Sequence, residues 1–174
     1  MVRSAIVSMR ILVFDVNTAE KYVPDTPTLA IRIFDSPASF GYNRFPVREG
    51  SRLQESAHYQ AILEYEFDDI DLMRKNQVAA GAAFNRSLAK QILSDFKQHY
   101  REGMDLIVHC NAGQRRSPAI AGGLNDIFTL GHDRFLNDHP DFNRHVYWTM
   151  IDTAIAERLV SDEQEQRFNM RRPR

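Results

Sequence analysis

Four apolar runs along the chain predict strands. Residues 5–14 (AIVSMRILVF) and 28–34 (TLAIRIF) are rich in branched side chains, which favour extended backbone. In residues 58–71, apolar and acidic side chains alternate from Leu63 onward, as in a strand with one buried and one solvated face. Residues 106–108 (LIV) form a short unbroken run, which is typical of a strand buried on both faces.

Other segments have the character of helices. Apolar side chains recur at helical spacing in 78–100 and 144–160, and 117–130 is an apolar segment that opens with a proline. The last segment, 161–174, is a polar tail. Strands that come first, followed by helices around one further strand, indicate an α/β protein with a single domain over 1–174. We expect a central mixed sheet of about four to five strands, flanked by helices.

The fourth apolar run leads into the segment with the most reactive side chains. It is followed by Cys110, the only cysteine, and then by Gly113, Arg116, Ser117 and Pro118. A hydroxyl that can cap and a proline at a first helical position are typical of a helix N-terminus. The pattern therefore predicts a strand, a tight loop and a helix, with a thiol where the loop begins and a guanidinium where it ends.

This arrangement is suited to binding an oxyanion. Successive backbone N–H groups point into such a loop, the helix dipole adds positive potential, and Arg116 can grip two oxygens at once. The same surroundings favour the thiolate form of Cys110, which is the nucleophilic form of a cysteine. A thiolate that faces a bound phosphate monoester is an activated nucleophile.

The residues around the cysteine read His109-Cys110-Asn111-Ala112-Gly113-Gln114-Arg115-Arg116-Ser117. This run resembles the His-Cys-x-x-Gly-x-x-Arg-Ser/Thr signature of cysteine-dependent protein tyrosine phosphatases, including the dual-specificity branch. The resemblance implies a central sheet flanked by helices, with the active loop between the carboxyl end of a strand and a helix. It also implies a hydrolase that acts through a phosphocysteine intermediate and needs no metal or organic cofactor.

The resemblance further implies a role for each residue of the signature. Cys110 attacks phosphorus, while Arg116 and the loop amides hold the phosphate oxygens and stabilise the transition state. Ser117 eases the departure of the thiolate from the phosphocysteine, and His109 orients the loop. Gln114 and Arg115 either contact substrate or belong to a solvated rim. The phosphate-binding loop is expected to comprise His109, Asn111, Ala112, Gly113, Gln114 and Arg115.

Cleavage also needs an acid that protonates the leaving oxygen. In dual-specificity phosphatases this acid is an aspartate at the end of the strand that precedes the signature, and here that strand ends with Asp68 and Asp69. Asp69 continues the apolar side of the alternating strand, where burial helps a carboxylic acid to keep its proton. We therefore expect Asp69 to be the acid and Asp68 the alternative. An aspartate downstream, Asp138 or Asp141, is a third option, since low-molecular-weight phosphatases place the acid after the cysteine loop.

Composition and charge argue against several other classes. The 174 residues carry a formal net charge of −1, whereas a general nucleic-acid binder is strongly basic. A single cysteine excludes an internal disulfide framework, and no apolar run approaches the roughly 18 residues of a membrane span. We expect a cytoplasmic protein, because Arg10 and Asp15 interrupt the apolar stretch that a signal sequence requires. No metal is expected, since His132, His139 and His145 fit no metal-ligand spacing.

The sequence therefore predicts a phosphomonoesterase of the protein tyrosine or dual-specificity phosphatase type. Phosphotyrosine in a protein is the favoured substrate, because inositide-directed relatives tend to carry lysines in the loop and this chain has none. A small phosphomonoester, such as an inositide, or an RNA 5′ end is the alternative substrate. Two other classes of protein are also open: a module that recognises phosphate without turnover, and a rhodanese-like sulfurtransferase, whose loop lacks the Gly-x-x-Arg-Ser arrangement.

Overall fold

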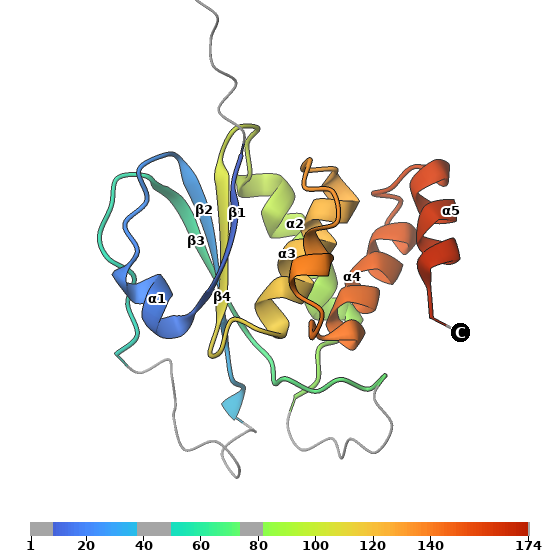
Figure 1. Ribbon diagram of the computed structural model, residues 1–174, viewed down its shortest axis with the longest axis horizontal. Helices are drawn as coiled ribbons and strands as arrows, with labels where there is room; N and C mark the ends of the chain where they lie inside the picture. The colour runs from blue at the N-terminus through green and yellow to red at the C-terminus, as the bar shows by residue number, and fades with distance from the viewer. Residues whose placement is uncertain (1–8, 38–49, 74–81, 174) are drawn as a thin grey trace, which may run out of the picture.

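The computed structural model describes residues 9–37, 50–73 and 82–173. At its centre lies a sheet of four strands, in which β4 pairs with both β1 and β2 and the order is β1-β4-β2-β3 (Figure 1). The strands are β1 (Ile11–Asp15), β2 (Thr28–Phe34), β3 (Tyr59–Glu66) and β4 (Asp105–Cys110). The strand that ends in the cysteine thus has a neighbour on each side.

All three pairings in this sheet are parallel. The α/β class and the central sheet with flanking helices are confirmed, whereas the expected mixed pairing is not found among the described strands. Parallel strands require crossover connections of a dozen or more residues. The connection from β3 to β4, which lie on either side of β2, contains a whole helix. Hydrophobic patterns indicate where strands lie, but they do not indicate the direction in which strands pair.

Burial accounts for the residues that form the strands. Every residue of β2 and β4 is buried, as the unbroken apolar runs predict. β3 lies at an edge of the sheet and alternates between more and less exposed residues, as its apolar and acidic pattern predicts. The first predicted run, 5–14, corresponds to β1, and its residues 5–8 lie outside the described residues.

Five α-helices surround the sheet in the described part of the chain. They are α1 (Val16–Lys21), α2 (Arg86–His99), α3 (Arg116–Phe128), α4 (Arg144–Ala156) and α5 (Asp162–Arg171), and a short 3-10 helix, η2 (Phe135–Asp138), precedes α4. α1 lies on one side of the sheet, while α2, α3 and α4 lie on the other with α5 outermost (Figure 1). In the ranges described, no helix has the length and apolar character needed to cross a bilayer.

A side-chain cap decides where α2 begins. The side chain of Asn85 accepts a hydrogen bond from the backbone N–H of Leu88 at 3.0 Å, so the first helical residue is Arg86. The predicted helix over 78–100 therefore starts too early, and its residues 78–81 lie outside the described residues. Apolar spacing continues across a cap, which is why spacing alone extends the helix too far.

The polar tail contains a helix that its composition did not predict. α5 begins with a capping box, in which the hydroxyl of Ser161 accepts from the backbone of Gln164 and the side chain of Gln164 accepts from the backbone of Ser161. Phe168 is buried and belongs to the hydrophobic core. A cap and one apolar anchor therefore hold this helix, in a segment where hydrophobic periodicity gives no signal.

Candidate active site

The turn between β4 and α3 lies where the carboxyl ends of the parallel strands meet, which we call the carboxyl edge of the sheet. It packs against the end of β1. Gly113 has a φ of 68°, and a Cβ at this position would lie 2.7 Å from main-chain atoms of Phe14 and Asp15. The backbone N–H of Val16 donates to the carbonyl of Asn111 at 3.2 Å. Glycine is required here, because any side chain would push the turn away from β1.

The thiol lies at the start of this turn and is almost completely buried. Cys110 is 3% exposed, Ser117 is fully buried, and their Sγ and Oγ atoms are 3.2 Å apart. A serine hydroxyl at this distance can donate a hydrogen bond to a thiolate. The capping role that the sequence suggested for Ser117 is wrong: Arg115 occupies the N-cap position without a side-chain bond, and the hydroxyl of Ser117 faces the sulfur.

Arg116 extends from the start of α3 to the carboxyl ends of β2 and β3. Its Nη1 donates to the carbonyl of Phe67 at 2.7 Å, and its Nη2 lies 2.7 Å from the carboxylate of Asp35. The side chain of Arg116 is 5% exposed, and Asp35 also accepts from the side chain of Asn111 at 2.8 Å. The guanidinium is therefore fixed by the protein itself, and these contacts use two of its five N–H groups.

Asp35 is a residue of this site that the sequence analysis missed. It directly follows β2, the neighbour of β4. The carboxyl ends of parallel strands meet at one edge of the sheet, so an aspartate after β2 must lie near the cysteine turn. The available signal was the position of Asp35 directly after a strand, but an expected mixed sheet leaves open which end of that strand lies beside Cys110.

Arg115 ties two other segments to the rim of the turn. Its Nε lies 2.7 Å from Asp69, its Nη2 lies 3.4 Å from Asp71, and its Nη1 donates to the carbonyl of Asp141 at 3.1 Å. Asn143, which the sequence analysis also missed, donates from its side chain to Asp69 at 2.8 Å and from its backbone to the carbonyl of Arg115 at 3.0 Å. The segments after β3 and before α4 therefore meet at Arg115.

The two candidate acids are placed differently from the strand-based expectation. Asp69 is half-buried, with 33% of its side chain exposed, whereas Asp68 is 5% exposed. Asp68 accepts two bonds from Ser36, at 2.9 and 2.5 Å, and one from the backbone of Ala82 at 2.7 Å. The prediction that Asp69 is the more buried of the two is wrong, because β3 ends at Glu66 and its alternation does not continue into the loop.

His109 lies buried behind the cysteine turn. Its Nε2 accepts a hydrogen bond from Nε of Arg32 at 3.0 Å, so the proton of the neutral ring resides on Nδ1. Arg32 is held in turn by Glu64 at 2.9 Å and by Ser51 at 2.6 Å. Burial, together with the positive charge of Arg32, lowers the pKa of His109 to about 4. His109 is therefore suited to positioning the turn, and not to proton transfer near neutral pH.

The remaining predicted residues lie around the rim. Ala112 and Gln114 are exposed at the crest of the turn. Asp138 and Asp141 are exposed as well, and Asp141 contacts Arg115 through its carbonyl. The structure thus brings Cys110 and Ser117 into contact, and it ties Arg116 to Asn111 of the same turn through Asp35. Asp69 is connected to the turn through Arg115.

Known proteins give no guide to this site. Comparison with family models, with curated proteins and with solved structures finds no match for this chain. Within residues 9–37, 50–73 and 82–173, no three His, Cys, Asp or Glu side chains are grouped so as to hold a metal ion. What the site offers chemically is a buried thiol before a helix N-terminus, a hydroxyl 3.2 Å from its sulfur, and a guanidinium that Asp35 and Phe67 hold in place.

Proposed function

We propose that the protein is a cysteine-dependent phosphomonoesterase of the tyrosine or dual-specificity phosphatase type. The observation that carries the proposal is the closed turn of residues 110–116, in which the sulfur of Cys110 lies 3.2 Å from the hydroxyl of Ser117 and Asp35 fixes Arg116. Loop amides, a helix N-terminus and a guanidinium together favour a tetrahedral dianion. A thiolate beside such a dianion is placed to attack its phosphorus.

The proposed reaction has two steps. In the first, the thiolate of Cys110 forms a bond to phosphorus while the bond from phosphorus to the leaving oxygen breaks, and the leaving oxygen takes a proton from Asp69. In the second, water attacks the phosphocysteine, its proton returns to Asp69, and the thiolate departs with a hydrogen bond from Ser117. Arg116 and the loop amides stabilise the charge that develops on the phosphoryl oxygens in both steps.

The ion pair between Asp69 and Arg115 adds a condition to this reaction. The two groups lie 2.7 Å apart, so the pair has to open and the carboxylate has to take up a proton from solvent before Asp69 can donate one. The phosphate of the substrate supplies the cause, because a dianion in the turn competes with Asp69 for Arg115. Arg115 thereby couples the arrival of phosphate to the release of the acid. Asp68 is less suited as the acid, since three hydrogen bonds already occupy its carboxylate.

Aryl phosphates, and phosphotyrosine in a protein above all, are the substrates that we favour. Leu72 and Met73 directly follow Asp71 at the rim, and they are 52% and 44% exposed. Exposed apolar side chains beside an anion site offer a surface on which an aromatic ring can pack. An inositol ring or a short aliphatic ester gains little from such a surface.

Turnover of p-nitrophenyl phosphate tests the proposal. We expect the wild type to release p-nitrophenol and Cys110→Ser to lower kcat by about 10⁴-fold or more, because a serine hydroxyl is a far weaker nucleophile than a thiolate. Calorimetry should show that Cys110→Ser still binds vanadate. Ser94→Ala, a substitution on the surface of α2, is the matched control and should leave kcat unchanged.

Other results assign the site differently. Vanadate binding without turnover of aryl phosphate, phosphopeptide, inositide or RNA 5′-phosphate by the wild type would favour a phosphate-recognition module. Sulfur transfer from thiosulfate to cyanide would favour a sulfurtransferase. Full turnover by Cys110→Ser would rule out a thiolate nucleophile.

A further inference from the structure

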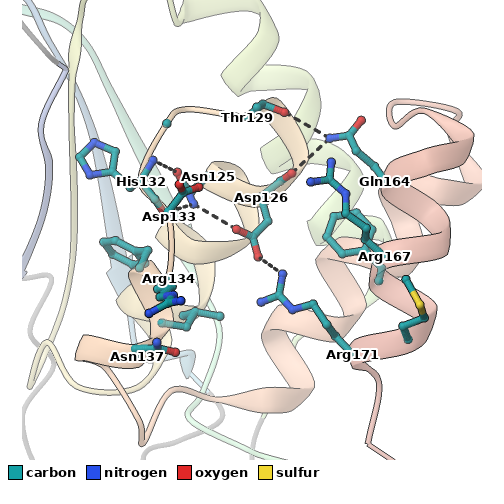
Figure 2. Close-up of a pocket in the computed structure, with 15 residues that line it drawn as sticks. Asn125, Asp126, Thr129, His132, Asp133, Arg134, Asn137, Gln164, Arg167 and Arg171 are labelled. Carbon is teal, nitrogen blue, oxygen red and sulfur yellow. Dashed lines mark hydrogen bonds and ion pairs between the residues drawn. The ribbon is translucent and has the colours of Figure 1, made fainter.

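A cavity of about 620 Å³ opens at the other end of α3 from the cysteine, between α3, the segment that contains η2, and α5. Figure 2 shows Arg134 and Asn137 on one side of this cavity, and Arg167 and Arg171, which come from α5, on the other. Asp126 lies between the two sides. The cavity shares none of its lining residues with the cysteine turn.

Both walls of the cavity are fixed to α3. The side chain of Asn125, 4% exposed, accepts from the backbone N–H of His132 at 3.1 Å and donates to its carbonyl at 3.0 Å. Leu136 sits directly on Gly122, where any added side chain would collide with it. On the opposite wall, Gln164 donates to two carbonyls near the end of α3, at 3.3 and 3.1 Å. The cavity is therefore a stable feature of the fold.

The charged side chains that line the cavity carry an excess of one positive charge. Three arginines and two aspartates line the cavity, and one of the aspartates, Asp126, already accepts from the hydroxyl of Tyr147 at 2.7 Å and pairs with Arg171 at 3.4 Å. In the part of the chain that the structure describes, the side chains of Arg134 and Arg167 form no hydrogen bond or ion pair. Two guanidinium forks thus offer donors to a ligand from opposite sides.

The backbone at Arg134 gives independent support. Arg134 has a φ of 61°, in the left-handed region where asparagine and glycine are favoured over residues with long side chains. The turn itself therefore does not call for arginine at this position. What the position provides is a guanidinium at the edge of a cavity whose remaining wall includes the apolar side chains of Phe135, Leu136 and Phe168.

We propose that this cavity binds an organic oxyanion, a phosphate, sulfonate or carboxylate group carried on an apolar or aromatic body. Arg134 and Arg167 hold the anionic group by charge-assisted hydrogen bonds from opposite walls. The apolar body packs against Phe135 and Leu136, which are only partly buried. This site is independent of the proposed phosphatase activity, because it lies at the other end of α3 and has its own donors.

Amide NMR shifts during titration with phenylphosphonate, an aryl oxyanion that the enzyme cannot hydrolyse, test the site. In the wild type we expect saturable shifts for the amides of 132–137 and 164–171. In the double variant Arg134→Asn, Arg167→Gln we expect the Kd from these amides to rise at least about tenfold, because two charge-assisted bonds are lost. Asparagine suits the left-handed backbone at 134, so the variant should keep the native spectrum elsewhere.

The same titration includes a control variant and can give results that contradict the proposed anion site. Lys97→Gln removes one positive charge from α2 and should leave the Kd unchanged. Absence of saturable shifts up to roughly 10 mM ligand, an unchanged Kd in the double variant, or an equal rise in Lys97→Gln would each overturn the proposal. The amides of 111–117 report the cysteine turn separately, so failure to bind there counts against the phosphatase proposal alone.

Discussion

The parallel strands begin at one side of the sheet, the amino edge, and end at the other, the carboxyl edge. Each of these edges holds an aspartate paired with an arginine, and the two pairs differ in structure. At the amino edge, Asp105 opens β4 and lies 2.6 Å from Arg10, directly before β1. At the carboxyl edge, Asp35 follows β2 and lies 2.7 Å from Arg116. At the amino edge the more buried partner is the carboxylate of Asp105, with 3% of its side chain exposed. At the carboxyl edge it is Arg116, with 5% of its side chain exposed.

We interpret this difference as one between a pair that stabilises the fold and a pair that serves the proposed reaction. Asp105 accepts from the backbone and Nε of Arg10, at 2.7 and 2.8 Å, and from Thr26 at 2.6 Å. Burial raises the pKa of Asp105, but the bonds from Arg10 and Thr26 outweigh this and hold the pKa below its usual value. Both oxygens of the buried Asp105 carboxylate accept hydrogen bonds from the protein, so this group stabilises the fold. The buried guanidinium of Arg116 keeps N–H groups beyond those that Phe67 and Asp35 use, and in the proposed function these bind the phosphate.

Substitution of Arg116 and of Arg10 by lysine tests this comparison, and Arg116→Lys should cause the largest change in kcat/KM. Lysine cannot reproduce the planar fork of Arg116, so Arg116→Lys should lower kcat/KM for an aryl phosphate by about 10³-fold. Arg10→Lys should leave kcat/KM within about twofold of the wild type, because 43% of the Arg10 side chain is exposed at the opposite edge. Initial rates measure both values. Similar losses of kcat/KM in the two variants would contradict the interpretation that Arg116 acts in the proposed reaction and Arg10 does not.

The carboxylate at the amino edge should matter for stability alone. Asp105→Asn places an amide N–H against the donors of Arg10 and Thr26, so the free energy of unfolding should fall by about 3 kcal/mol while kcat stays unchanged. Urea denaturation at constant slope measures this fall. The control is Asp25→Asn. Asp25 is the other partner of Arg10, its side chain is 72% exposed, and its substitution should leave the free energy of unfolding almost unchanged. Equal costs for the two variants would contradict the role given to burial.

His109 makes the carboxyl edge sensitive to acid. Its pKa is about 4 in the folded protein and roughly 6.5 in the unfolded chain, so between these values the unfolded chain binds a proton that the folded protein does not. The stabilising contribution of the neutral ring is therefore complete above pH 6.5, and up to about 3 kcal/mol of it is lost as the pH falls to about 4.

The measurement for His109 is a difference between two proteins. The free energy of unfolding of the wild type minus that of His109→Gln, followed from pH 7 to 4, isolates this residue because the carboxylates cancel. The carbonyl of glutamine can still accept from Arg32, so the fold is retained. His58→Gln, at an exposed position, serves as the control. A difference that does not change with pH would show that His109 titrates normally.

Asp35 should give the smallest effect. Asp35→Asn keeps an acceptor for Arg116 but removes its charge, which weakens the bond that orients the guanidinium. We expect kcat/KM for an aryl phosphate to fall about tenfold, which corresponds to about 1.4 kcal/mol. Steady-state kinetics beside Asp25→Asn, at the other edge, measure the fall. Unchanged kinetics in Asp35→Asn would mean that Phe67 alone orients Arg116.

Local signals predicted the parts of the fold that local forces determine. β2 coincides with the predicted run 28–34, and the strand, turn and helix around Cys110 lie where the sequence placed them. The structure of each of these segments is determined by residues within it: an unbroken apolar run, a glycine at a close approach, or a proline near a helix start. For the same reason Cys110, Arg116 and Ser117, which are close in sequence, could be grouped from the sequence.

The rest of the site depends on contacts between distant segments. Asp35 and Asn143 could not be assigned, because their positions near Cys110 follow from strand order and from the path before α4. The burial of Asp68 and Asp69 was reversed, because a rule for strands was applied beyond the end of β3. In the same way, caps determine α5, and hydrophobic periodicity does not detect caps.

The interior position of β4 has a consequence for when the cysteine turn forms during folding. Arg10 and Asp105, which close the β1–β4 pair, are 95 residues apart in sequence, so the cysteine turn has no support until most of the polypeptide has been synthesised. Non-local pairing of this kind is slow, whereas α2, α3 and α4 depend on neighbouring residues. During refolding from urea, helical circular dichroism should therefore return before the proposed phosphatase activity does.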